Sequence, residues 1–162
     1  MIEVLVAMLV VGSAAMAILM LQLHALRSQR DAVHQATAAG LATELAELRA
    51  ANRAVAAEGH DPYLFSVGPA HATSATTNDC ATGCDAEGFT RSAIAEWSAR
   101  LARELPAAQA VVCRDGRANA DADWRCDHDP SAPVIIKLGW RSGAEAAAPS
   151  DAAPLMALPI GR

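Results

Sequence analysis

Apolar residues follow one another without interruption near the N-terminus of this sequence. From Val4 to Leu23 the chain carries no charged residue, and Gln22 is the only strongly polar side chain. A helix of this length spans roughly 30 Å, the hydrocarbon thickness of a bilayer. A signal peptide and the buried helix of a larger core are the alternatives. However, the run is too long for a signal peptide, and Glu3 stands where basic residues would be expected. The pattern predicts a membrane anchor at residues 1–23.

A periodic pattern follows the uniformly apolar segment. Apolar residues recur at steps of three, four, seven or eight, with charged residues mainly between them and Thr37 as the one weak position. This predicts that the helix continues as an amphipathic helix to about Ala57, ending before Gly59 and the Asp61-Pro62 pair. Its apolar stripe needs a partner. The stripe consists of Leu26, Val33, Leu41, Leu45, Leu48 and Val55.

The second half of the chain shows one more helix and then short strands. Residues 62–78 are rich in Gly, Pro, Ser and Thr and predict a loop with at most one helical turn. Thr90 is the predicted N-cap of a helix that ends before Pro106 and carries Ile94, Trp97, Leu101 and Leu105 on one face. Predicted strands are 110–113, 123–126 and 134–140, with an edge strand at 155–160 after a loop at 144–154.

This order of elements defines the predicted fold class. A long helix followed by strands predicts an α+β protein, in which a small antiparallel sheet packs on the helix. The length of 162 residues suits one domain with an appendage. We therefore expect a helical anchor at 1–23 and a globular head at 24–162, with Trp97, Trp124 and Trp140 in its core.

Charge and motifs argue against several functions. The net charge of -5 and a pI near 5.4 give no support for binding nucleic acid or anionic lipid head groups. The sequence has no Gly-x-Ser-x-Gly motif and no glycine-rich phosphate loop. His60-Asp61 and Asp127-His128-Asp129 lie in turn-like sequence, where such residues are ordinarily solvated. We expect no enzymatic activity, no cofactor and no metal.

Four cysteines form two pairs that are local in sequence. Cys80 and Cys84 are separated by three residues, unlike the two-residue spacer of disulfide oxidoreductases. Cys113 and Cys126 would meet if they lie on two adjacent strands joined by a loop that includes Asp115-Gly116. A four-cysteine zinc site is the rival interpretation, but the second spacing is wide for one. The prediction is two disulfides, Cys80–Cys84 and Cys113–Cys126.

The orientation of the anchor rests on two signals that disagree. Arg27 and Arg30 follow the apolar run, and the positive-inside rule would place them in the cytoplasm. Only Met1 to Glu3 precede the run, so that comparison lacks one side. Disulfides form in oxidising compartments such as a bacterial periplasm. We therefore expect the head outside the cytoplasm.

Glu3 is a carboxylate at the edge of the apolar run. At the centre of a bilayer an acid costs about 2.5 to 3.5 kcal/mol on insertion scales, so it needs a partner or an interface. The residues alone leave both possibilities open.

Several motifs together resemble one protein family. Residues 2–7 read IEVLVA, which closely resembles the start of mature type IV pilins and pseudopilins. Within that superfamily, residues 47–53, ELRAANR, are similar to the Arg-Ala-Asn-Arg stretch of the PilV family of minor pilins. The order of the four cysteines, of IAEW at 94–97, of Leu105-Pro106 and of Trp140 is also similar.

The resemblance implies a structural role in pilus assembly. Such minor pilins wait in the inner membrane with the head in the periplasm, help to initiate the pilus, and are thought to lie near its tip. The implied partners are other minor pilins, the major pilin and the inner-membrane assembly machinery, with a tip adhesin as a further candidate. In this class the glutamate that Glu3 matches is taken to pair with the N-terminal amine of a neighbouring subunit.

The sequence departs from the family at two places. The basic leader, the glycine of the cleavage site and the first aromatic residue are absent, so Met1 falls at the third mature position, and we expect the natural chain to begin earlier. Ala107-Ala108 stand where the family tends to have glycines. A minor pseudopilin of a type II secretion system is the alternative function, and a membrane-anchored periplasmic enzyme or binding protein is a further one.

Overall fold

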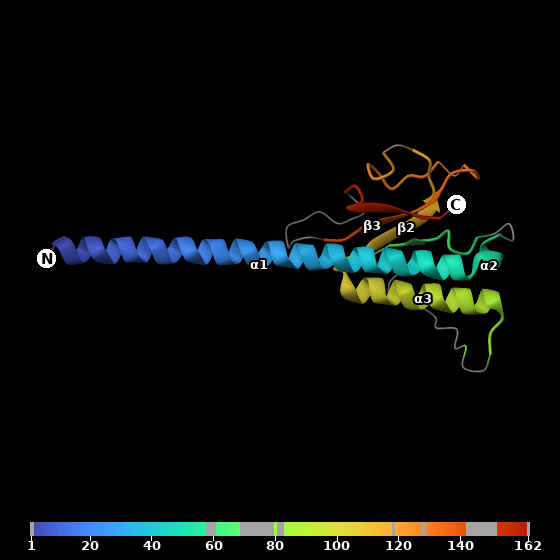
Figure 1. Cartoon of the computed structure of the whole chain (residues 1–162), viewed down its shortest axis with the longest axis horizontal. Helices are drawn as coiled ribbons and strands as arrows, with labels where there is room; N and C mark the ends of the chain where they lie inside the picture. The colour runs from blue at the N-terminus through green and yellow to red at the C-terminus, as the bar shows by residue number, and fades with distance from the viewer. Residues whose placement is uncertain are drawn as a thin grey trace. The chain divides into compact units, whose positions relative to one another are not determined.

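The computed structural model describes residues 2–57, 61–68, 80, 83–117, 119–127, 129–141 and 152–161. By its contacts the chain divides into two compact units, Met1–Gln35 and Ala36–Arg162. The division reflects contacts within the chain, and the predicted membrane boundary at residue 23 is a separate matter. The elements are α1 (Ile2–Ala51), α2 (Arg53–Ala57), β1 (Ser66–Val67), α3 (Ala86–Glu104), β2 (Gln109–Arg114), β3 (Val134–Gly139) and β4 (Met156–Gly161) (Figure 1).

The first unit consists of the N-terminal part of α1. Every side chain from residue 2 to residue 30 is exposed, including Ile2, Leu5, Leu9 and Met20. One 18-residue window of the helix has a mean hydropathy of 2.7, and none of it is buried. The helix is therefore long and apolar enough to span a membrane once, which is consistent with single-pass anchoring.

The C-terminal part of α1 forms one wall of the second unit. Leu41 and Leu45 are buried in the core and Leu48 packs partly against it, so the predicted stripe is confirmed there. The predicted continuation to Ala57 is interrupted at Asn52, which separates α1 from α2. The Asn52 side-chain amide donates to the Leu48 carbonyl at 3.0 Å. The main-chain bonds from the Asn52 N–H to the Leu48 carbonyl and from the Ala56 N–H to the Asn52 carbonyl are kept, at 3.1 and 3.2 Å, so α2 continues to Ala57.

Helix α3 begins earlier than the sequence predicts. Thr90 was the predicted N-cap, but the cap is Asp85, whose carboxylate accepts from the Gly88 N–H at 2.7 Å. Thr90 lies inside the helix, where it is buried and donates to the Ala86 carbonyl. An aspartate satisfies the free N–H groups of a first turn as well as threonine does, so residue type alone did not separate the two.

The sheet has four antiparallel strands in the order β1-β2-β3-β4. Strands β2, β3 and β4 agree with the predictions at 110–113, 134–140 and 155–160, and β4 is an edge strand as expected. Strand β1 falls in the stretch predicted as loop. The predicted strand at 123–126 is wrong, because those residues form a loop. With the second part of α1 packed on this sheet, the α+β fold class is confirmed.

The apolar core lies between the sheet and the two long helices. In Figure 1, α3 runs beside the C-terminal part of α1. Trp97 of α3 is fully buried and donates its indole N–H to the Leu41 carbonyl at 2.9 Å. It also meets the ring of Phe65 edge-on, with the centroids 5.8 Å apart. Trp140 is buried as predicted, whereas Trp124 is only half-buried.

The turn between α3 and β2 has an unusual backbone. Ala107 has a φ of 49°, in the left-handed region that favours glycine. Ala107 is therefore a non-glycine residue held in a conformation that a Cβ atom makes unfavourable.

Candidate functional site

Glu3 lies in the first turn of α1, where its carboxylate meets the positive end of the helix dipole. Its side chain is exposed, and no ion pair among the described residues includes it. The residues beside it, Ile2 and Val4, are 80% and 60% exposed. The turn thus presents a single negative charge within an apolar surface, and a cation from another molecule can reach it.

The apolar surface around Glu3 covers the whole circumference of the helix. Exposed apolar residues include the consecutive run from Val4 to Val11, and successive residues of a helix are 100° apart. A helix that is apolar on every side is stable only in lipid or among other apolar helices. This segment can therefore be buried by either surrounding.

The four cysteines are paired in the structure as Cys80–Cys84 and Cys113–Cys126. Cys113 lies on β2, but Cys126 lies in a loop, so the expectation of two adjacent strands was wrong. The Cα atoms of this pair are 6.3 Å apart across a sequence separation of 13. The loop from 115 to 126 therefore returns to the strand from which it starts.

A buried ion pair holds this loop against the sheet. Lys137 in the middle of β3 and Asp115, the residue that follows β2, are both fully buried. The Lys137 ammonium donates to Asp115 Oδ2 at 2.7 Å, and also to the carbonyls of Asp123 and Arg125. All three donors of the ammonium are thereby used, so no buried N–H of this group is left without an acceptor.

Arg117 completes the network on the solvent side. Its guanidinium binds Asp115 Oδ2 at 2.8 Å and Asp123 Oδ1 at 2.9 Å. The hydrogen bond from Arg117, followed by the one from Lys137, holds the pKa of Asp115 well below its usual range despite burial. The hydrogen bond from Arg117 also lowers the pKa of Asp123. The sequence did contain a signal for this network, a single lysine inside the apolar strand VIIKLGW.

A second buried ion pair fixes the end of α1. Arg49 donates through Nε and Nη2 to Asp61 Oδ2, at 3.1 and 2.9 Å. The other carboxylate oxygen accepts from the Tyr63 N–H, and the buried Tyr63 hydroxyl donates to the Leu48 carbonyl. Asn52 donates to the same hydroxyl. Arg49 and Asn52 of the ELRAANR segment thus anchor the chain as it leaves the helix.

The histidine and aspartate groups considered as candidate chemical sites have structural roles where they are described. His60 and His128 lie outside the described residues. Asp61 is the partner of Arg49, and Asp127 Oδ2 accepts from the Gly116 N–H. Asp129 accepts from the N–H and hydroxyl of Ser131, which lower the pKa of its carboxyl. In the part of the chain that the structure describes, no cluster of three or more His, Cys, Asp or Glu residues could hold a metal.

No family model, curated protein or solved structure matches this chain at a significant level.

Proposed function

We propose that this protein is a minor pilin-like structural subunit that takes part in the assembly and initiation of a type IV pilus, near its tip. The observation that carries the proposal is the N-terminal part of α1, which is apolar and exposed on every side and bears one carboxylate in its first turn. The IEVLVA motif adds the likeness to mature pilins.

In this proposal the subunit exists in two surroundings. Before assembly, the first part of α1 spans the inner membrane and the head faces the periplasm, where its disulfides form. During assembly, the same apolar surface leaves lipid and packs among the helices of other minor pilins and the major pilin. The transfer is feasible because lipid and a helix bundle are both apolar, so little hydrophobic free energy changes.

Glu3 supplies the specificity that a uniformly apolar helix lacks. Its partner is the N-terminal amine of a neighbouring subunit. The attraction between two unit charges about 4 Å apart grows steeply as the effective dielectric constant falls. A pair that is weak in water therefore becomes strong enough in an apolar surrounding to set the register of one helix beside the next.

The test compares pilus incorporation of Glu3→Ala with that of the unaltered protein. Each gene is expressed at full length with its leader in a piliated bacterium, and the subunit is quantified in sheared pili and in inner membranes. We expect Glu3→Ala to leave the membrane level and the head fold unchanged and to reduce the pilus content markedly, because the registering charge is lost.

Glu47→Ala is the matched control, since Glu47 is an exposed glutamate on the same helix within the head. It should incorporate normally, as should substitutions of His128 and Asp129. Normal incorporation of Glu3→Ala would remove the role of this residue. Incorporation into a secretion pseudopilus and not into pili would assign the protein to the type II secretion class.

A further inference from the structure

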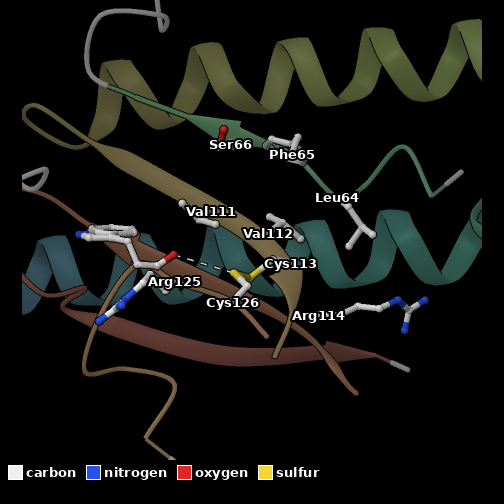
Figure 2. Close-up of a pocket in the computed structure, with 10 residues that line it drawn as sticks. Leu64, Phe65, Ser66, Val111, Val112, Cys113, Arg114, Arg125 and Cys126 are labelled. Atoms are coloured by element: carbon white, nitrogen blue, oxygen red, sulfur yellow. Dashed lines mark hydrogen bonds between the residues drawn. A yellow bond between two sulfur atoms is a disulfide. The ribbon is translucent and has the colours of Figure 1, made fainter. Parts of the chain in front are cut away.

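A groove of about 540 Å³ lies on the outer face of the sheet, beside strands β1 and β2. Leu64, Ser66 and Val111 line it from the strand side, and Trp124 and Cys126 line it from the loop that the disulfide closes. Figure 2 shows the Cys113–Cys126 disulfide between the side chains of Arg125 and Arg114. The groove is thus mainly apolar and belongs wholly to the second unit.

The charge of the groove is opposite to that of the chain. Its described lining contains two arginines and no acidic residue, although the chain has a net charge of -5. Arg114 uses Nη1 to donate to the Ala132 carbonyl, and Arg125 makes one contact of 3.4 Å to Asp123. Each guanidinium has five N–H donors, so both retain donors for a carboxylate.

The backbone beside the groove is also open. The Val112 N–H donates to the Phe65 carbonyl at 2.8 Å, so the even-numbered residues of β2 turn their main-chain groups towards β1. Strand β1 pairs only with Ala110 and Val111. Arg114 lies beyond that ladder, and its N–H and C=O have no β1 partner in the described part of the chain.

We propose that this groove binds an extended segment of another protein, in which an apolar side chain stands next to Asp or Glu. The apolar side chain would fill the groove between Val111 and Trp124, and the carboxylate would bind Arg114 or Arg125. The open main-chain groups of Arg114 favour a polypeptide, since an extended segment supplies matching N–H and C=O groups. The proposal does not depend on a role in pili.

The experiment selects binding peptides on the full chain embedded in lipid nanodiscs. A display library of random linear peptides is enriched on this protein, and the affinity of the best peptide is measured for three variants. We expect enriched peptides to pair an apolar residue with Asp or Glu. Affinity should fall by about tenfold or more in the Arg114→Gln/Arg125→Gln variant, because the carboxylate then finds neither guanidinium and loses its charge-assisted contact. Val111→Glu should abolish binding.

Arg91→Gln is the matched control, because Arg91 is an exposed arginine of α3 outside the groove. It should bind as tightly as the unaltered protein, and tryptophan fluorescence confirms that each variant is folded. The proposal is overturned if no peptide is enriched, if enriched peptides lack an acid, or if the double variant binds normally. Binding of a heparin fragment at the groove without any peptide would also overturn it.

Discussion

The two faces of strand β3 are covered by different chemistry. On one face, Val134, Ile136 and Leu138 belong to the apolar core shared with α1 and α3. On the other face, Lys137 is equally buried but meets a carboxylate and two carbonyl groups. Apolar contacts are many and individually weak, whereas each polar contact in a buried site is specific and costly to remove.

The difference shows what each face of β3 requires of the segment that packs on it. The apolar face accepts any well-fitting apolar surface, so helical periodicity is enough to supply one. The polar face accepts only groups that complete the hydrogen bonds of Lys137. The carbonyls of Asp123 and Arg125 serve the ammonium in place of a strand ladder.

The largest expected effect comes from breaking the polar face at Asp115. Asp115→Ala leaves the fully buried Lys137 without its counter-charge, which typically costs about 3 to 5 kcal/mol of unfolding free energy. Urea unfolding of the full chain in detergent micelles measures this, with tryptophan fluorescence as the readout. The signal reports the head alone, because the three tryptophans are Trp97, Trp124 and Trp140.

Lys137→Met is the control for this prediction. It leaves Asp115 paired with Arg117 at 2.8 Å, so its cost should be smaller, about 1 to 3 kcal/mol. Equal losses for the two variants would show that the ammonium and the carboxylate are equally dependent on each other, contrary to the role assigned to Arg117.

The same pair predicts the response of the head to acid. The pKa of Asp115 is lowered in the folded protein, so its contribution to stability is fully present above its unfolded pKa of about 3.9. That contribution is lost as the pH falls from there through the folded pKa. Asp115→Asn should therefore flatten the acid limb of the stability profile, and an unchanged limb would mean that another group dominates.

Truncating Leu45, which belongs to the apolar core, should lower the unfolding free energy by nearly as much. Leu45 of α1 is fully buried, and Leu45→Ala should lower the unfolding free energy by about 2 to 5 kcal/mol, because a cavity remains. The same urea titration measures it. A loss within about 0.5 kcal/mol, the usual range at surfaces, would mean that the helix does not pack as described.

Opening the disulfide tests the loop independently of the ion pair. Cys113→Ser/Cys126→Ser should cost about 3 kcal/mol, from the entropy of a loop of this length in the unfolded chain. Peptide mapping by mass spectrometry without reduction should also find both local pairs. Two free thiols, a crossed pairing or bound zinc would contradict this arrangement.

The smallest expected effect concerns the contact between α3 and α1. Trp97→Phe keeps a ring beside Phe65 but loses the indole hydrogen bond to the Leu41 carbonyl, which should cost about 1 to 2 kcal/mol. Thermal unfolding of the same samples gives the value. A loss larger than that of Leu45→Ala would indicate that α3 is held to α1 mainly through this one bond.

The sequence by itself determined the elements whose signals are local. Helical periodicity located the stripe of Leu41 and Leu45, and apolar runs located β2, β3 and β4, because a helix or a strand imposes its own repeat on the side chains. The uniformly apolar start predicted a helix that could span a membrane from its length and composition, without any repeat. The cap of α3 is equally local, since the bond from the Gly88 N–H to Asp85 spans only three residues, but Thr90 offers the same chemistry a few residues later.

Only the tertiary structure decided which distant groups meet. Lys137 binds Asp115 across 22 residues, and the loop that was predicted as a strand takes its shape from that contact. The short β1, the partner of Arg49 and the groove at Arg114 depend equally on how separate segments are placed. Such contacts leave no repeat in the sequence, because each of them needs only one side chain at one position. Each contact becomes favourable only when the rest of the fold has excluded water from it.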